Sequence, residues 1–205
     1  HSYQLPRQLF DRLQKHLIVM KMHINGSHHN ARMLEENQIP YVVLYRDLRD
    51  VAVSYVHYVR VTPWHPEFQV YQHLTIEDGL VRFANTHLMD YESWIRSWES
   101  NRHAALSLSM RYEDLLENTG EVFSSVVRHF ELPVSDKLIK KTIKKHSFQR
   151  MSGGRARGEE QAGSFVRKGK AGDWKNYFTA EIKDLFKSKT GQFLIDFGFE
   201  NDLDW

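Results

Sequence analysis

Residues 167–174 read RKGKAGDW, and the first six of them hold three cationic side chains and two glycines. Glycine lets backbone N–H groups approach a ligand closely, and successive N–H groups in a turn form a concavity that binds anions. Arginine offers a planar fork to a phosphate, and lysine a point charge. Asp173 can cap a helix whose N-terminus also favours an anion. The stretch therefore predicts a phosphate clamp on a loop, with a solvated basic loop as the alternative.

A longer string around this stretch resembles a known signature. Residues 167–179, RKGKAGDWKNYFT, closely resemble the sequence RKGxxGDWKxxFT near the C-terminus of the sulfotransferase family. Members of that family transfer a sulfuryl group from 3′-phosphoadenosine 5′-phosphosulfate (PAPS) and release adenosine 3′,5′-bisphosphate (PAP). The resemblance implies that Arg167, Lys168 and Gly169 bind the 3′-phosphate of the nucleotide.

A second match follows the clearest predicted strand. Residues 40–45 are β-branched and aromatic, and a helix is predicted from about residue 48 to residue 59. Ligands in open α/β sheets bind beyond the carboxyl ends of the strands, which places Arg46 and Ser54 for an anion. Residues 46–54, RDLRDVAVS, resemble the family's RNxKDVAVS, in which the Arg and the Ser contact the 3′-phosphate. The alternative pairs Arg46 with Asp50 and leaves Ser54 as a small helix residue.

The candidate base lies earlier in the chain. The apolar run from residue 16 to residue 22 predicts a buried strand, and KMH at residues 21–23 resembles the family's KTH. The resemblance implies that His23 is the general base and that Lys21 touches the sulfuryl group, and an imidazole suits this role because its pKa lies near neutral pH. His28 and His29 are competing candidates. A metal site built from these three histidines lacks a cysteine or a well-spaced carboxylate.

Shorter matches concern the adenine and the acceptor. Tyr112 lies in YEDL, a family element whose Tyr approaches the adenine, and HSF at residues 146–148 resembles TSF, whose Phe stacks on that ring. Ser147 and Phe148 are therefore candidate nucleotide ligands, although Tyr112 at a sheet edge and Phe148 in the core are equally reasonable. Residues 91–98, YESWIRSW, resemble YGSWxxHxxxW, so Trp94 and the loop 62–72 are expected to border the acceptor pocket.

The composition excludes several classes of protein. The 205 residues carry a net charge of +2, which disfavours a general polyanion binder, so we expect no nucleic-acid partner. The chain has no cysteine and therefore no disulfides. It has neither a membrane-length apolar run nor a recognisable signal peptide, so we expect a cytoplasmic protein without a membrane partner. Residues 175–184 approximate the family's dimer motif KxxxTVxxxE, which favours a monomer or a weak homodimer.

Strand and helix patterns alternate along the chain. Besides the elements above, helical spacing appears at residues 6–15, 31–37, 75–100, 115–130 (interrupted near Gly120), 135–145 and 181–197, and a strand pattern at residues 104–110. Residues 62–71 are expected to form an irregular loop and residues 152–164 a mobile one. We therefore expect an α/β three-layer sandwich with a mostly parallel sheet, like the P-loop-nucleotide-hydrolase-type fold of sulfotransferases. The whole chain, residues 1–205, is expected to be one domain.

One family element has no match in these residues. Sulfotransferases wrap the 5′-phosphosulfate in an N-terminal strand–loop–helix resembling YPKSGTTW, and we expect a domain without that unit. The sequence predicts a sulfotransferase that uses PAPS, a small-molecule acceptor with a hydroxyl or amine, and no metal. The alternative is a non-catalytic module that binds PAP. A P-loop kinase is disfavoured because G-x-x-x-x-G-K-[ST] is missing.

Overall fold

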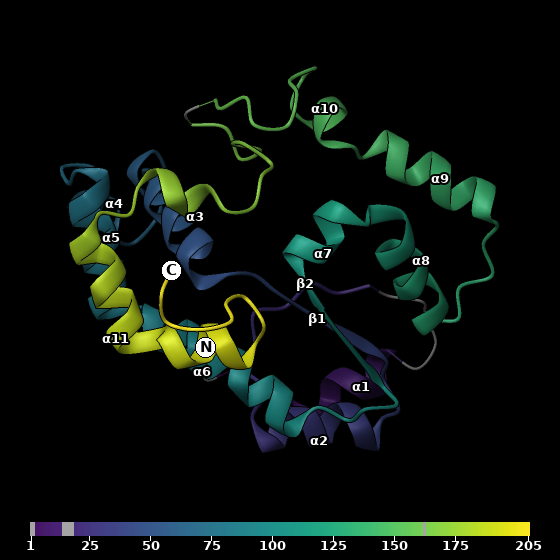
Figure 1. Cartoon of the computed structure of the whole chain (residues 1–205). Helices are drawn as coiled ribbons and strands as arrows, with labels where there is room; N and C mark the ends of the chain where they lie inside the picture. Colours follow the sequence, from purple (N-terminus) through teal and green to yellow (C-terminus); the bar gives the residue numbers. More distant parts are fainter. Residues whose placement is uncertain (1–2, 14–18, 162) are drawn as a thin grey trace.

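A pair of parallel strands lies at the centre of the molecule (Figure 1). The computed structural model describes residues 3–13, 19–161 and 163–205. Strand β1 (Tyr41–Tyr45) pairs with β2 (Ser107–Arg111), with Tyr41 opposite Ser107 and Tyr45 opposite Arg111. Because the strands are parallel, their carboxyl ends meet at one edge of the sheet, and the residues that follow them come together there.

The main hydrophobic core lies between helices that follow β1 and a helix near the C-terminus. It is built from α3 (Leu48–Arg60), α5 (Ile76–Thr86), α6 (Leu88–Asn101) and α11 (Ala180–Asp196), with the short α4 (Phe68–Tyr71) beside α3. Helix α3 is buried along one face because apolar residues recur at helical spacing: Leu48, Ala52, Val53, Val56 and Val59. The helices α3 to α6 thereby form the crossover that parallel strands require.

A second core holds the N-terminal part of the described chain against the sheet. Helices α1 (Arg7–Leu13) and α2 (His28–Glu36) lie beside the strands (Figure 1), and the buried side chains are Leu5, Phe10, Ile24, Met33, Leu34, Val43 and Trp98. The buried Asn30 accepts a hydrogen bond from the backbone N–H of Leu5 and donates to the carbonyls of Tyr3 and Asn25. Helices therefore pack against a parallel pair of strands, which confirms the α/β class.

The remaining elements lead to the signature region. They are α7 (Tyr112–Glu117), α8 (Thr119–His129), α9 (Asp136–Lys145), α10 (Phe148–Met151) and the 3₁₀ helix η1 (Asp173–Asn176). Residues 152–172 contain turns but no helix or strand, apart from residue 162, which is not described. No helix within the described ranges is both long and apolar enough to cross a membrane.

Four sequence predictions about elements need correction. Of the strand predicted at residues 16–22, residues 16–18 lie outside the described chain and residues 19–22 form no strand, and Val19 is 89% exposed. The helix predicted at residues 75–100 is divided at His87 into α5 and α6. The ring of His87 forms a hydrogen bond with Glu67. The helix predicted at residues 115–130 is interrupted at Asn118, close to the predicted position, but it starts earlier, at Tyr112. The loop predicted at residues 62–71 contains the short helix α4.

Candidate functional site

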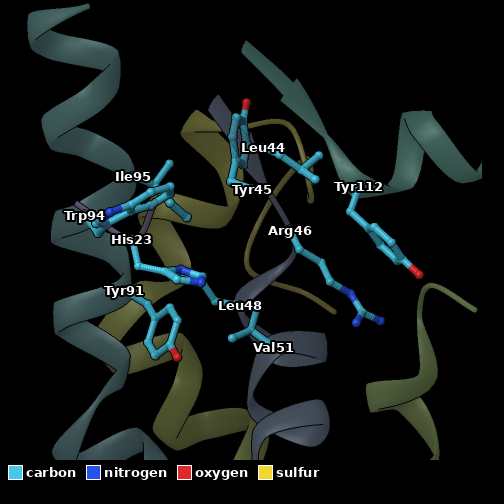
Figure 2. Close-up of a pocket in the computed structure, with 10 residues that line it drawn as sticks. All are labelled: His23, Leu44, Tyr45, Arg46, Leu48, Val51, Tyr91, Trp94, Ile95 and Tyr112. Carbon is cyan, nitrogen blue, oxygen red and sulfur yellow. The ribbon is translucent and has the colours of Figure 1, made fainter. Parts of the chain in front are cut away.

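A cavity of about 390 Å³ opens at the carboxyl end of β1. Figure 2 shows His23, Tyr91 and Trp94 on one side of it and Arg46 and Tyr112 on the other. The walls between them are mainly apolar, and the full set of lining residues is His23, Leu44, Tyr45, Arg46, Leu48, Val51, Tyr91, Trp94, Ile95 and Tyr112. A polar group at either end of an apolar cavity is the usual plan of a small-molecule site.

His23 reaches this cavity because the residues after it are fixed to α6. The carbonyl of Ile24 accepts hydrogen bonds from the indole N–H groups of Trp94 and Trp98, the latter at 3.1 Å. The N–H of Gly26 donates to Ser97 Oγ at 2.9 Å, and a β-carbon at residue 26 would lie 2.5 Å from the backbone of Trp98. The glycine is therefore required for this close approach, which holds His23 at the cavity.

The other candidates from the same region lie elsewhere. Lys21 is exposed and is not among the residues that line the cavity. The sequence predicted that Lys21 and His23 would lie together at the site, but only His23 lines the cavity. His28 and His29 form the start of α2, where His29 Nε2 lies 3.1 Å from the carbonyl of Leu5. Within the described ranges, no group of three or more metal-ligating side chains is placed to hold a metal ion.

Arg46 extends from the end of β1 toward the signature loop. Its guanidinium donates to Asp50 and to the carbonyl of Lys170, both at 3.1 Å, and lies 4.6 Å from the centre of the Tyr112 ring. The ion pair with Asp50 therefore exists, as the alternative interpretation predicted, and the cation also lines the cavity. Among the described residues, the buried Nε–H of Arg46 has no hydrogen-bond partner, which leaves a donor for an anion.

Asp50 joins α3 to the signature loop, a role that the sequence patterns did not predict. Its buried carboxylate accepts hydrogen bonds from the N–H of Gly172 at 2.7 Å and the N–H of Trp174 at 3.0 Å. The buried Arg49 stacks 3.9 Å from the Trp174 ring and pairs with Asp47. Two adjacent residues of α3 therefore fix the loop against the end of β1.

The two signature cations share carboxylate partners. Arg167 pairs with Asp173 at 2.6 Å and with Glu160 at 2.7 Å, and Lys168 pairs with Asp173 at 2.6 Å. Burial tends to raise the pKa of Asp173, but hydrogen bonds from Lys168, Arg167 and Asn176 outweigh it and lower that pKa to about 2. Asp173 thus orders both cations and does not occupy the capping position that the sequence suggested, since Gly172 is the N-cap residue of η1.

The remaining nucleotide candidates surround this cluster. Gly169 has a φ of +62°, and a β-carbon there would overlap the ring of Phe148 at the start of α10. Ser147 precedes that helix, and Ser54 is exposed on α3. The structure brings Phe148 and Gly169 together, and Arg46 contacts both the same loop, at the carbonyl of Lys170, and the ring of Tyr112.

Two further residues at the cluster were missed by sequence reasoning. His57 of α3 lies with its Nδ1 4.0 Å from Glu160, and its ring packs at 5.3 Å against that of Tyr177. Burial and the nearby Arg167 lower the pKa of His57. His57 lies three residues after Ser54, a spacing that puts both on one face of a helix and could have indicated it. No sequence pattern indicated Glu160, because it lies in an irregular, glycine-rich stretch.

Known proteins match most of the chain. The family model for the sulfotransferase domain matches residues 6–198. Dog sulfotransferase 1B1 is 31% identical over 163 residues, covering 74% of this chain and 53% of the relative. Bovine sulfotransferase 1E1 is 27% identical over 164 residues, with the same two coverages. The chain thus spans about half the length of these curated relatives.

The solved structures agree on the fold. The crystal structure of mouse sulfotransferase SULT7A1 complexed with PAP superposes with a TM-score of 0.65 at 23% identity, covering 82% of this chain and 64% of that one. At this level of identity the likeness concerns the fold, which is the one that the sequence motifs predicted. Together with the match over residues 6–198, these findings establish that the chain belongs to the sulfotransferase family.

Proposed function

We propose that this protein transfers a sulfuryl group from PAPS to a hydroxyl or amine of a small-molecule acceptor. The observation that carries the proposal is the arrangement at the end of β1. A cavity with a histidine and aromatic side chains adjoins a cationic loop that Asp50 holds in place. The mouse relative was solved as a complex with PAP, the product that such a reaction leaves.

The nucleotide would lie between β1, α3 and the signature loop. Arg46 supports this placement with its buried Nε–H, which has no hydrogen-bond partner within the described ranges, and Arg167 and Lys168 supply further charge-assisted donors for the 3′-phosphate. Gly169 offers backbone access, and the exposed Ser54 hydroxyl faces no competing partner among the described residues. Tyr112 and Phe148, with Ser147 beside it, would hold the adenine. These groups suit a dianionic phosphate next to a purine.

The acceptor would occupy the apolar cavity beside Trp94. His23 would accept the acceptor's proton as the acceptor oxygen or nitrogen bonds to sulfur, while the bond from sulfur to the nucleotide phosphate breaks and PAP leaves. Positioning and charge stabilisation dominate such in-line transfers, as in phosphoryl transfer. Lys21 remains a candidate for the equatorial oxygens only if the segment before His23 turns toward the cavity, since that lysine does not line it.

The wider setting of the reaction follows from the same proposal. We place the protein in the cytoplasm, without nucleic-acid or membrane partners, and treat residues 1–205 as belonging to one sulfotransferase domain. Thr179 caps α11 through a bond from the N–H of Ile182, so the degenerate dimer motif is partly used within the chain. We therefore expect a monomer or a weak homodimer in light scattering, and a tight dimer at nanomolar concentration would contradict this.

Calorimetry with PAP and 5′-AMP tests the nucleotide assignment. PAP should bind more tightly, because only PAP presents a 3′-phosphate to the cluster. A hydrogen bond to a charged group contributes about 1.5–3 kcal/mol, so Arg167→Ala should weaken PAP binding by about ten-fold or more. Arg128→Ala, at an exposed position on α8, is the matched control and should leave the affinity unchanged. Equal affinity of the unaltered protein for the two nucleotides would refute the assignment.

A further inference from the structure

Glu160 lies within the cationic cluster that the proposed function assigns to the 3′-phosphate. Its carboxylate is 2.7 Å from Arg167 Nη1 and 3.7 Å from Lys168 Nζ. Tyr177 donates its hydroxyl to the same carboxylate at 3.4 Å, and His57 Nδ1 lies 4.0 Å away. Four groups from three parts of the chain thus converge on one side-chain anion, as they would on a bound phosphate.

With Glu160 in place, the ion-paired groups of the cluster carry no net charge. Asp173 and Glu160 balance Arg167 and Lys168, and Asp50 balances Arg46. Burial and the nearby guanidinium lower the pKa of His57, which favours its neutral imidazole. A phosphate dianion gains little from a neutral cluster and is repelled by a carboxylate at the same cations. Removal of one carboxylate would restore a net positive site.

The two carboxylates differ in how firmly they are held. The Asp173 side chain is 1% exposed and has three hydrogen-bond donors, whereas the Glu160 side chain is 31% exposed. The backbone around Glu160 is anchored separately. Gly158 donates its N–H to the carbonyl of Lys168 at 2.9 Å, and the guanidinium of Arg155 bonds to the carbonyl of Arg167 at 2.7 Å. The Glu160 side chain can therefore rotate into solvent without disturbing the loop.

We propose that Glu160 is an internal counter-ion that occupies the anion cluster when no nucleotide is bound and is displaced by the 3′-phosphate. By competing for Arg167 and Lys168, it weakens PAP binding and speeds PAP release, while it keeps the two cations ordered in the empty site. The inference rests on the proposed function, because it takes the 3′-phosphate to be the ligand of this cluster. The competing carboxylate makes Glu160 a determinant of nucleotide affinity.

The test compares Glu160→Gln with Glu159→Gln by calorimetry, using PAP and 5′-AMP as ligands. Glutamine keeps the size of the side chain and removes its charge. Glu159 is the matched control, because its carboxylate accepts a hydrogen bond only from the N–H of Ala156 among the described residues. We expect Glu160→Gln to bind PAP at least about three-fold more tightly than the unaltered protein. This change in affinity corresponds to the free energy of a partly exposed ion pair. Its affinity for 5′-AMP should not change, and Glu159→Gln should match the unaltered protein with both ligands.

The outcomes separate this inference from the function on which it rests. If the unaltered protein prefers PAP to 5′-AMP but Glu160→Gln and Glu160→Ala bind PAP equally well or less well, Glu160 supports the site instead of competing for it, and the inference alone is wrong. If the unaltered protein shows no preference for PAP, both the inference and the nucleotide assignment fail. Tighter binding of 5′-AMP as well as PAP by Glu160→Gln would also overturn the inference, because the effect would not depend on the 3′-phosphate.

Discussion

The ring of Phe148 lies directly against the backbone of Gly169, in space that any side chain at residue 169 would need. The contact joins α10 to the loop that carries Arg167 and Lys168. Arg155 adds to it, because its guanidinium lies 5.5 Å from the centre of the same ring. An aromatic surface proposed to hold adenine is thereby set beside the cations proposed to bind the 3′-phosphate.

Gly169→Ala should therefore impair both folding and nucleotide binding. Its φ of +62° disfavours a side chain, and a β-carbon would push Phe148 away from the loop. We expect a loss of about 2 kcal/mol or more in the free energy of unfolding and about ten-fold weaker PAP binding. Gly153→Ala is the control, since it has a similar φ of +76° but no atom within 4 Å of the new methyl group. Equal effects of the two substitutions in urea denaturation and calorimetry would contradict a specific role of the Phe148 contact.

Asp50→Asn should destabilise the protein strongly. The amide group can accept a bond from one of the Gly172 and Trp174 N–H groups, but its NH₂ would face the other donor, and Arg46 would lose its counter-ion. Breaking a buried, hydrogen-bonded pair costs about 3–5 kcal/mol. Asp114→Asn removes a carboxylate from an exposed pair with Arg111 and should cost less than about 1 kcal/mol. Urea denaturation of both variants measures the difference, and a cost for Asp50→Asn below that of Asp114→Asn would show that Asp50 does not hold the loop.

The acid stability of the protein should depend on Asp173. Its pKa is lowered from 3.8 to about 2 in the folded protein, so the unfolded chain binds a proton more readily than the folded one. The stabilisation is complete above about pH 4 and is lost as the pH falls from 4 to 2, by about 2 kcal/mol. Asp173→Asn should be less stable at neutral pH, and its free energy of unfolding should fall less steeply over that interval. Parallel pH profiles for the two proteins would contradict the prediction.

His23→Ala tests the base assignment. In the native full-length protein, assayed with PAPS and an acceptor found by screening with radiolabelled PAPS, kcat should fall by about 10²–10⁴-fold because general-base catalysis is lost. PAP affinity should hardly change, since His23 lies on the Trp94 side of the cavity. His28→Ala and His29→Ala are the controls, because both positions lie in α2 outside the cavity. If turnover survives in His23→Ala and is lost in either control, another histidine is the base.

Local patterns predicted the part of the site that follows β1. The β-branched strand, the helix after it and the position of Arg46 are encoded within about twenty consecutive residues, and the structure has all three. The segment before His23 could not be predicted in this way. Its apolar run suggests a strand, but residues 19–22 pair with no strand, and His23 is positioned by hydrogen bonds to α6, about seventy residues away in sequence.

The carboxylates around the signature cations were equally hidden from sequence patterns. Asp50 looked like a partner of Arg46 alone, because its bonds to the N–H groups of Gly172 and Trp174 depend on how the loop crosses α3. Glu160 reaches Arg167 only because turns anchored by Arg155 fold the preceding residues back onto the signature. Such long-range pairings arise from tertiary packing, which periodicity and local spacing do not report.

The link between Asp50 and the loop also determines when the site can exist. Its two hydrogen bonds join residues 122 and 124 positions apart, so most of the chain must close upon itself before they form. Contacts between such distant residues carry a loop-closure entropy and characterise slowly folding topologies. A nascent or truncated chain that ends before Gly172 would present Arg46 without the ordered loop that is proposed to bind the 3′-phosphate. Because a ligand stabilises only the state that binds it, bound nucleotide would protect completely folded molecules from proteolysis. Partly folded molecules, in which the loop has not yet joined α3, would remain open to degradation.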